Sequence, residues 1–128
     1  MTDARLERAF AAIDAANADD PNTIVVDGCH RPKELAHAEL MTRWVEALDP
    51  DPSDAQLLAA RAHHVRRWTI PRSDFPEGRA GYLRWRARLG RLHAELAAEI
   101  LADVGYPTDV TERVGEIITK KRLATDPQ

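Results

Sequence analysis

The sequence predicts an all-α protein, a bundle of about five helices. Two observations support this fold class. Apolar residues recur at spacings of three and four along most of the chain, and prolines fall between these periodic segments instead of inside them. The chain of 128 residues has the usual length of one domain and can bury one helical core. We therefore expect residues 1–128 to form a single helical domain.

The first helix is expected over residues 4–17, because Leu6, Phe10 and Ile13 recur at helical spacing. A polar break follows it. Residues 23–28, with the sequence Thr-Ile-Val-Val-Asp-Gly, have the composition of one short strand or of an extended loop. No partner strand is evident, so we expect no sheet of any size.

The second helix is expected from Lys33 to Leu48. It would place His37, Met41, Trp44 and Leu48 on one apolar stripe. The sequence Asp-Pro-Asp-Pro at 49–52 must end this helix, since proline cannot continue one. The boundary after the second helix is therefore well marked.

Ser53 and Gln56 form a plausible capping box for a third helix that runs to about Trp68. On this helix His64 and Trp68 share a face. His63 is rotated from His64 by about 100°, so the two adjacent histidines are expected to point in different directions. We expect His64 to face inward.

Residues 70–78 contain two prolines and a glycine and are expected to form a loop. The longest helix should run from Arg79 to Val104, with His93 on an apolar stripe. Gly105 is a natural left-handed cap for its end. A last helix, capped by Asp109 with Glu112, is then expected over residues 109–118.

Charge is distributed unevenly along the chain. Between Arg61 and His93 nine arginines stand against two acids, so this segment has a formal charge of +7 although the whole chain has −3. Aromatic residues are interleaved with these arginines. The segment is the expected anion-binding region, and we favour a small phosphorylated or other anionic ligand over nucleic acid because the whole chain is acidic.

We expect a cytoplasmic protein without a membrane anchor. No apolar run has the length needed to span a bilayer, and the N-terminus lacks the apolar core of a signal peptide. The single Cys29 cannot form an internal disulfide. Cys29 and His30 are not expected to act as nucleophile and base, because adjacent residues in an extended segment point to opposite sides.

Three histidines fall on the apolar sides of separate predicted helices: His37, His64 and His93. Helical bundles build metal sites from facing helices, and neutral imidazole is a good ligand for divalent zinc, manganese, nickel or iron. The sequence thus suggests a metal site made by these histidines. The alternative is that they are hydrogen-bonded core residues, since no close-spaced motif such as H-E-x-x-H is present.

Five arginines are the candidate anion ligands, because a guanidinium group presents a planar fork of donors that matches phosphate or carboxylate oxygens. They are Arg66, Arg67, Arg72, Arg79 and Arg86. Other arginines of the last long helix are expected to form its solvated face. The alternative is that all of them stack on aromatic rings and form ion pairs within the fold.

The segment His93–Leu101, followed by Gly105-Tyr106-Pro107 and a capped helix, resembles the histidine-bearing helix of HD-superfamily metal-dependent phosphohydrolases. The resemblance implies an HD-like helical bundle. In that superfamily a histidine, a histidine–aspartate dyad and a distant aspartate hold one or two divalent metal ions that activate water against phosphoesters. His37 would match the first ligand and His63-His64 the dyad, although histidine replaces the dyad aspartate here.

A broader set of motifs covers nearly the whole chain. It comprises Asp20-Pro21-Asn22, Pro32-Lys33-Glu34-Leu35, the runs at 64–72 and 81–86, and His93-Ala94. These motifs resemble an uncharacterised helical domain family, some of whose members are labelled glutamyl-tRNA synthetases, although the chain has no nucleotide-binding motif of that enzyme class. Members of the family continue into another apolar helix with an acidic residue, so we expect this chain to be a single domain or a fragment of a longer one.

Together these patterns favour a metal-dependent hydrolase of a phosphoester, acting on a nucleotide-like or other small phosphorylated substrate. His37, His64 and His93 would hold a divalent metal ion, and the arginines would hold the phosphate. One alternative keeps the fold and the metal but performs iron-dependent oxygen chemistry. Another is a non-catalytic anion-binding or regulatory module. A homodimer is expected if an apolar stripe is left uncovered.

Overall fold

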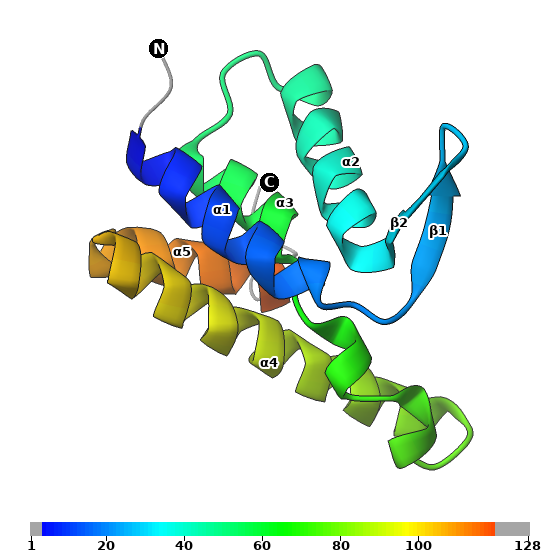
Figure 1. Ribbon diagram of the computed structural model, residues 1–128. Coiled ribbons are helices and arrows are strands. Elements are labelled where there is room, and N and C mark those ends of the chain that lie inside the picture. The colour runs from blue at the N-terminus through cyan, green and yellow to red at the C-terminus, as the bar shows by residue number, and fades with distance from the viewer. Residues whose placement is uncertain (1–3, 120–128) are drawn as a thin grey trace.

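A computed structural model describes residues 4–119, which form five α-helices, two short 3-10 helices and one β-hairpin (Figure 1). The α-helices are α1 (Ala4–Ala18), α2 (Lys33–Leu48), α3 (Asp54–Ala62), α4 (Arg79–Val104) and α5 (Thr108–Thr119). The hairpin is formed by β1 (Thr23–Val26) and β2 (Cys29–Pro32), and the 3-10 helices are η1 (Arg67–Thr69) and η2 (Arg72–Asp74). The predicted all-α helical bundle is confirmed.

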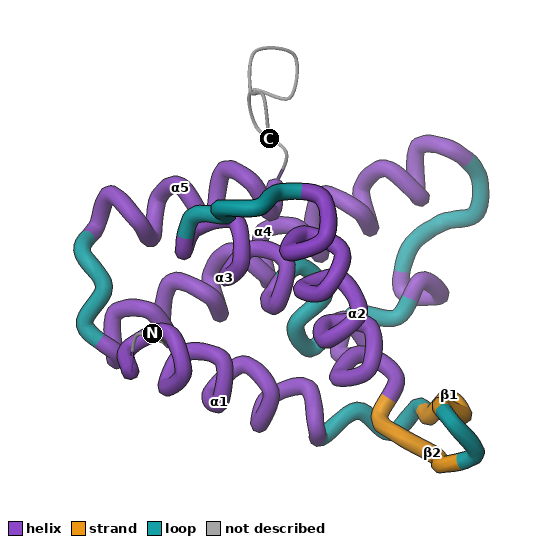
Figure 2. Tube along the Cα trace, turned by 90° about the horizontal axis from the view of Figure 1, so that it is seen from above, coloured by secondary structure: helices purple, strands orange, loops and turns teal. Residues whose placement is uncertain are grey.

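The core of the bundle lies around α3. This short helix packs against α1, α2 and α5, and the long helix α4 runs along α5 and α1 (Figures 1 and 2). Ile13 of α1, Leu58 of α3, Leu101 of α4 and Val114 of α5 are fully buried together. Four helices therefore share one apolar core. None of the helices in residues 4–119 is both long enough and apolar enough to cross a membrane.

Several predicted helix ends are confirmed. The Ser53 hydroxyl accepts the Gln56 N–H at 3.1 Å, and Gln56 Oε1 accepts the Ser53 N–H at 2.7 Å, which completes the capping box of α3. Gly105 ends α4 with a φ of 95°, the left-handed conformation expected of it. The helix α5 begins at Thr108, so Asp109 lies within its first turn instead of capping it.

The expected length of the third helix is wrong, because α3 ends at Ala62 and not near Trp68. Arg66 has a φ of 55° and a ψ of 32°, a left-handed conformation that no α-helix can continue through. Its backbone N–H donates to Oδ1 of the buried Asn17 at 3.2 Å. A tertiary contact to α1 therefore holds the break, and His63 to Arg66 form a turn.

The expectation of an unpaired strand is also wrong. β1 pairs antiparallel with β2, with Val25 opposite His30. Asp27 and Gly28 join the strands with φ values of 51° and 81°. Two consecutive positive φ values are typical of the tight hairpin turn for which Asp-Gly is a preferred sequence.

The helix α2 turns a different face to the bundle from the predicted one. Its buried residues include Glu34, Ala38 and Thr42. Trp44 and Leu48 of the predicted stripe are 55% and 78% exposed. Ala38 and Thr42 on the buried face have small side chains, and α2 packs against α3. The larger side chains of Trp44 and Leu48 remain exposed to solvent. Whether a second copy of the chain covers the exposed stripe is a prediction that these contacts leave untested.

Candidate functional site

The histidines of the +7 segment meet where the turn after α3 passes the middle of α4. The rings of His63 and His64 are stacked with centroids 3.9 Å apart, and the rings of His64 and His93 are 5.9 Å apart. The prediction that the two adjacent histidines point in different directions is wrong, because they lie in a turn where the angular spacing of a helix does not apply. All three rings line a cavity of about 1050 Å³.

His93 presents a buried nitrogen without a partner. The residue is 3% exposed, and its Nδ1 lies 2.8 Å from the carbonyl oxygen of Val65. Because a carbonyl only accepts, Nδ1 carries the proton and Nε2 has a free lone pair. Within residues 4–119, Nε2 is buried and makes no hydrogen bond. Leaving such an atom unsatisfied costs about 1–3 kcal/mol, so a ligand at this position would be stabilising.

The charge state of His93 suits a ligand role. Burial lowers its pKa to about 4, and the neighbouring His64 adds to this effect, although the hydrogen bond to Val65 opposes it. The imidazole is therefore neutral at pH 7, the form that binds metals. The pKa of His63 is also lowered to about 4, mainly by burial and then by the charge of His64. Its Nδ1 donates to the carbonyl oxygen of Ala60 at 3.0 Å.

Glu34 is the residue of this site that the sequence analysis missed. Its side chain is buried in the first turn of α2, with Oε1 3.4 Å from Nδ1 of His64 and 3.7 Å from Nδ1 of His37. Burial raises the pKa of Glu34, but His64, His37 and Arg67 together outweigh burial and hold the pKa below its usual range. A buried carboxylate thus faces two imidazoles. The Pro32–Leu35 motif contained this residue, but nothing in the motif shows that Glu34 is buried.

Of the three predicted metal ligands, the structure brings two into one cavity and leaves the third outside it. His64 and His93 line the same cavity. His37 does not line it, and its side chain is 38% exposed. The carboxylate of Glu34 lies between His37 and His64 and is the contact that connects His37 to the other site residues. His37 is therefore at the edge of the group, whereas His63, which was predicted to point elsewhere, is inside it.

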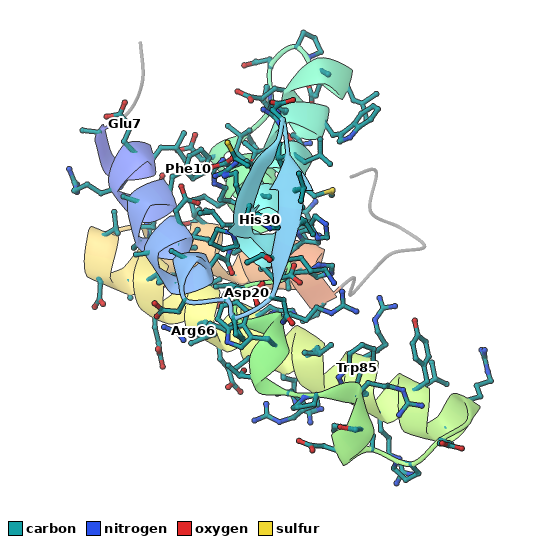
Figure 3. The ribbon with its side chains drawn as sticks, turned by 45° about the vertical axis from the view of Figure 1, so that its right-hand side comes forward. Glu7, Phe10, Asp20, His30, Arg66 and Trp85 are labelled. Carbon is teal, nitrogen blue, oxygen red and sulfur yellow. The ribbon has the colours of Figure 1, made fainter. Side chains whose placement is uncertain are left out.

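The five predicted anion ligands are similarly divided. Arg67 and Arg86 line the cavity beside the histidines. Arg66 pairs with Asp19 at 3.1 Å, near the C-terminal end of α1, and Figure 3 shows it well separated from Trp85. Arg72 donates to backbone carbonyl oxygens of the loop before α4, and Arg79 is exposed at the start of α4. Only the first two lie where they can meet a ligand of the histidines.

Arg67 differs from the other cations of this segment. Its guanidinium group lies 5.2 Å from the centroid of the Trp85 ring. Among the described residues it has no hydrogen bond from its side chain and no ion pair within 4 Å. Trp85 itself is fixed, because its Nε1 donates to the carbonyl of Ile70 at 2.8 Å. The stacking holds Arg67 in place while its donors remain open to an anion.

These side chains fit a divalent metal ion in their chemistry. Two neutral imidazoles and a carboxylate are common ligands of zinc, iron and manganese, and two buried atoms, Nε2 of His93 and Oε1 of Glu34, have no hydrogen-bond partner in residues 4–119. As these residues are arranged, however, no group of three or more His, Cys, Asp or Glu residues between 4 and 119 is placed to hold a metal ion. A metal bound here would need the ligands to move together or a further ligand.

Comparison with known proteins places the chain in a family. A family model described as "Domain of unknown function (DUF4202)" matches residues 7–128, nearly the whole chain. No curated protein and no solved structure matches it. The expectation that the chain belongs to an uncharacterised domain family is confirmed. The chain is a member of the DUF4202 family.

Proposed function

We propose that the protein is a metal-dependent hydrolase that cleaves phosphoesters in small phosphorylated, nucleotide-like substrates. The observation that carries this proposal is the free lone pair on the buried Nε2 of His93, a residue that lines the larger cavity together with His64 and with Arg67, which has no ion pair within residues 4–119. A core histidine with a purely structural role would have no need to leave a buried nitrogen unsatisfied. The resemblance of this helix to HD-superfamily phosphohydrolases supports the same proposal, and a cytoplasmic location is part of the proposal.

His64 and His93 would hold the metal ion, and His37 is the third ligand suggested by the resemblance. A bound divalent ion polarises phosphoryl oxygens and lowers the pKa of water. Glu34 would orient His64, because its carboxylate faces the Nδ1 side of that ring and leaves Nε2 for the metal. His63, with a pKa of about 4, is a poor proton acceptor at pH 7, so we assign it to packing against His64.

Arg67 would neutralise the charge that builds on the transferring phosphoryl group. Its position over Trp85 is set before substrate binds, so little side-chain ordering is required during the reaction. Arg86 lines the same cavity and is held by a hydrogen bond to the hydroxyl of Tyr82 at 2.9 Å. We therefore assign phosphate binding first to Arg67 and second to Arg86.

A non-catalytic anion-binding module is the second candidate. It is favoured by the shortage of metal ligands within residues 4–119, together with the unpaired guanidinium of Arg67. In this case His93 would be a core residue, and the protein would bind phosphate compounds in a salt-sensitive way without turnover.

Hydrolysis of a chromogenic phosphoester, p-nitrophenyl phosphate or its bis-ester, separates the two candidates. For the hydrolase we expect turnover that a chelator abolishes and that added zinc, manganese, nickel or iron restores. His93→Ala should lose this activity, whereas His30→Ala, which removes an exposed histidine of the hairpin, should keep it. Folded protein without metal-dependent turnover would contradict the hydrolase, and equal activity in both variants would contradict the assignment of His93.

A further inference from the structure

A second cavity, of about 210 Å³, is not used by the proposed reaction. It lies between the start of α2 and the loop that carries η1 and η2. Among residues 4–119, its lining includes the basic residues Lys33, Arg67 and Arg72, the aromatic residues Trp68 and Trp85, and one acid, Glu34. Arg67 also lines the larger cavity, so the two cavities adjoin at this side chain.

The wall of this smaller cavity is held by hydrogen bonds from several parts of the chain. The backbone N–H of Lys33 donates to the carbonyl of Asn22 at 2.9 Å, and the next N–H, of Glu34, donates to Oδ2 of the buried Asp20 at 2.9 Å. On the opposite side, the guanidinium of Arg72 donates to the carbonyl oxygens of Phe75 and Pro76. The cavity is therefore formed before any ligand arrives.

The charges around the smaller cavity are unbalanced. Neither the ammonium group of Lys33 nor the guanidinium of Arg67 has a hydrogen bond or ion pair with any residue in 4–119. Arg72 is bonded to carbonyl oxygens, which leave its positive charge in place. The carboxylate of Glu34 lies against His64 and His37 instead. Three basic residues and one acid, Glu34, line the cavity, so a net positive charge remains that an anion would offset.

Size and charge together indicate the class of this anion. The volume is below the roughly 300–1,000 Å³ of pockets that enclose whole drug-sized ligands, so it suits a single small group. A tetrahedral oxyanion with two negative charges offers oxygens to donors on several sides and balances more of the charge than a carboxylate does.

We infer that the smaller cavity is a second anion-binding subsite, which takes a phosphate group between Lys33, Arg67 and Arg72. If the proposed hydrolase function holds, its substrate is a compact molecule with two anionic groups. The group to be cleaved would lie beside His64 and His93, and the second group would lie in the smaller cavity. Arg67 would contact both.

Tryptophan fluorescence tests the subsite, because Trp68 and Trp85 line it and the remaining tryptophan, Trp44, lies on the exposed face of α2. The experiment uses Trp44→Phe protein with a chelator present and inorganic phosphate as the probe. We expect a saturable change in emission. Lys33→Met should weaken binding about tenfold or more, as the loss of a charged hydrogen bond does. Arg84→Met, which removes one positive charge from an exposed position of α4 outside both cavities, should bind as the parent does.

Three results would overturn the subsite: no saturable change with phosphate, equal weakening in Lys33→Met and Arg84→Met, or an equal response to acetate, which would remove the preference for phosphate. Because metal is chelated, phosphate binding is measured even if the protein hydrolyses nothing. Conversely, turnover that Lys33→Met leaves unchanged for substrates with two anionic groups would reject the subsite and leave the hydrolase intact.

Discussion

Acid should destabilise the protein through its neutral buried histidines at a higher pH than through Glu34 and Glu39. Burial lowers the pKa of His93 from 6.5 to about 4, so the unfolded chain binds a proton between these pH values and the folded chain does not. Stability therefore rises with pH across this window and is lost as the pH falls from about 6.5 toward 4. The acids with lowered pKa, Glu34 and Glu39, contribute only below their usual value of 4.5. Between pH 7 and pH 5 the histidines therefore contribute more to this loss than Glu34 and Glu39 do.

The size of this effect follows from the shift in pKa. At about 1.4 kcal/mol for each tenfold change in proton affinity, His93 alone accounts for about 3 kcal/mol over the whole window and about 2 kcal/mol between pH 7 and pH 5. His63 acts in the same direction, since its pKa is lowered as well. For a domain of this size a loss of 2 kcal/mol is a large share of the total stability.

Urea unfolding at pH 7, 6 and 5 measures this loss directly, with a chelator present. His93→Leu should make the free energy of unfolding depend less on pH, because the proton taken up on unfolding is removed together with the imidazole. His30→Leu is the matched control, since His30 is exposed, and it should behave as the parent does. If His93→Leu and the parent lose the same stability between pH 7 and pH 5, His93 is not the buried neutral base described here.

Two further predictions concern backbone packing and charge. Gly81→Ala should destabilise the protein by several kcal/mol in thermal unfolding, because the added Cβ would lie 1.8 Å from the carbonyl oxygen of Pro76. In Gly115→Ala the added Cβ meets only ordinary contacts, so this variant should be neutral or stabilised by about 1 kcal/mol. Arg67→Gln should lower phosphoester turnover about 100-fold, as expected for a group that stabilises developing charge, with only a small fall in the unfolding midpoint from the lost contacts to Trp85 and Glu34. Arg66→Gln should leave turnover nearly unchanged because Arg66 pairs with Asp19. Equal destabilisation by the two alanines, or equal turnover by the two glutamines, would contradict these assignments.

Local signals in the sequence were sufficient for much of the fold. The capping box at Ser53 and the glycine cap at Gly105 are short-range devices, and both lie where predicted. The hairpin was missed although its turn, Asp27-Gly28, is also a local signal. Its strands are short, and the second one, Cys-His-Arg-Pro, lacks the apolar alternation that indicates a strand.

Tertiary contacts decided the features that the sequence did not predict. The break at Arg66 depends on Asn17, which is 49 residues away in the chain. The inward face of α2 carries Ala38 and Thr42, whereas the apolar pattern favoured a neighbouring face about 90° around the helix. Glu34 follows from the same difference, because the rotation of α2 that exposes Trp44 also buries this carboxylate. No local rule places an acid in a core, so one member of the site required the structure.

Within the proposed site, the sequence correctly brought together His64 and His93 from different parts of the chain. The reasoning was only partly right, because His64 was expected on a helix and lies in a turn. Helix periodicity also separated His63 from His64, and the loss of that periodicity explains why their rings stack. The arginines were predicted as a group, but only contacts show which are already paired: within residues 4–119, Arg66 pairs with Asp19 and Arg67 has no ion pair.

The central claim is that the buried lone pair of His93 binds a metal ion. Metal content per chain, measured by plasma mass spectrometry after incubation with zinc, manganese, nickel or iron and removal of the excess, tests it most directly in the parent protein, His93→Ala and the control His30→Ala. We predict near-stoichiometric metal in the parent and the control and a marked loss in His93→Ala. Folded parent protein that retains none of these metals, or a His93→Ala variant that retains as much as the parent, would contradict the claim.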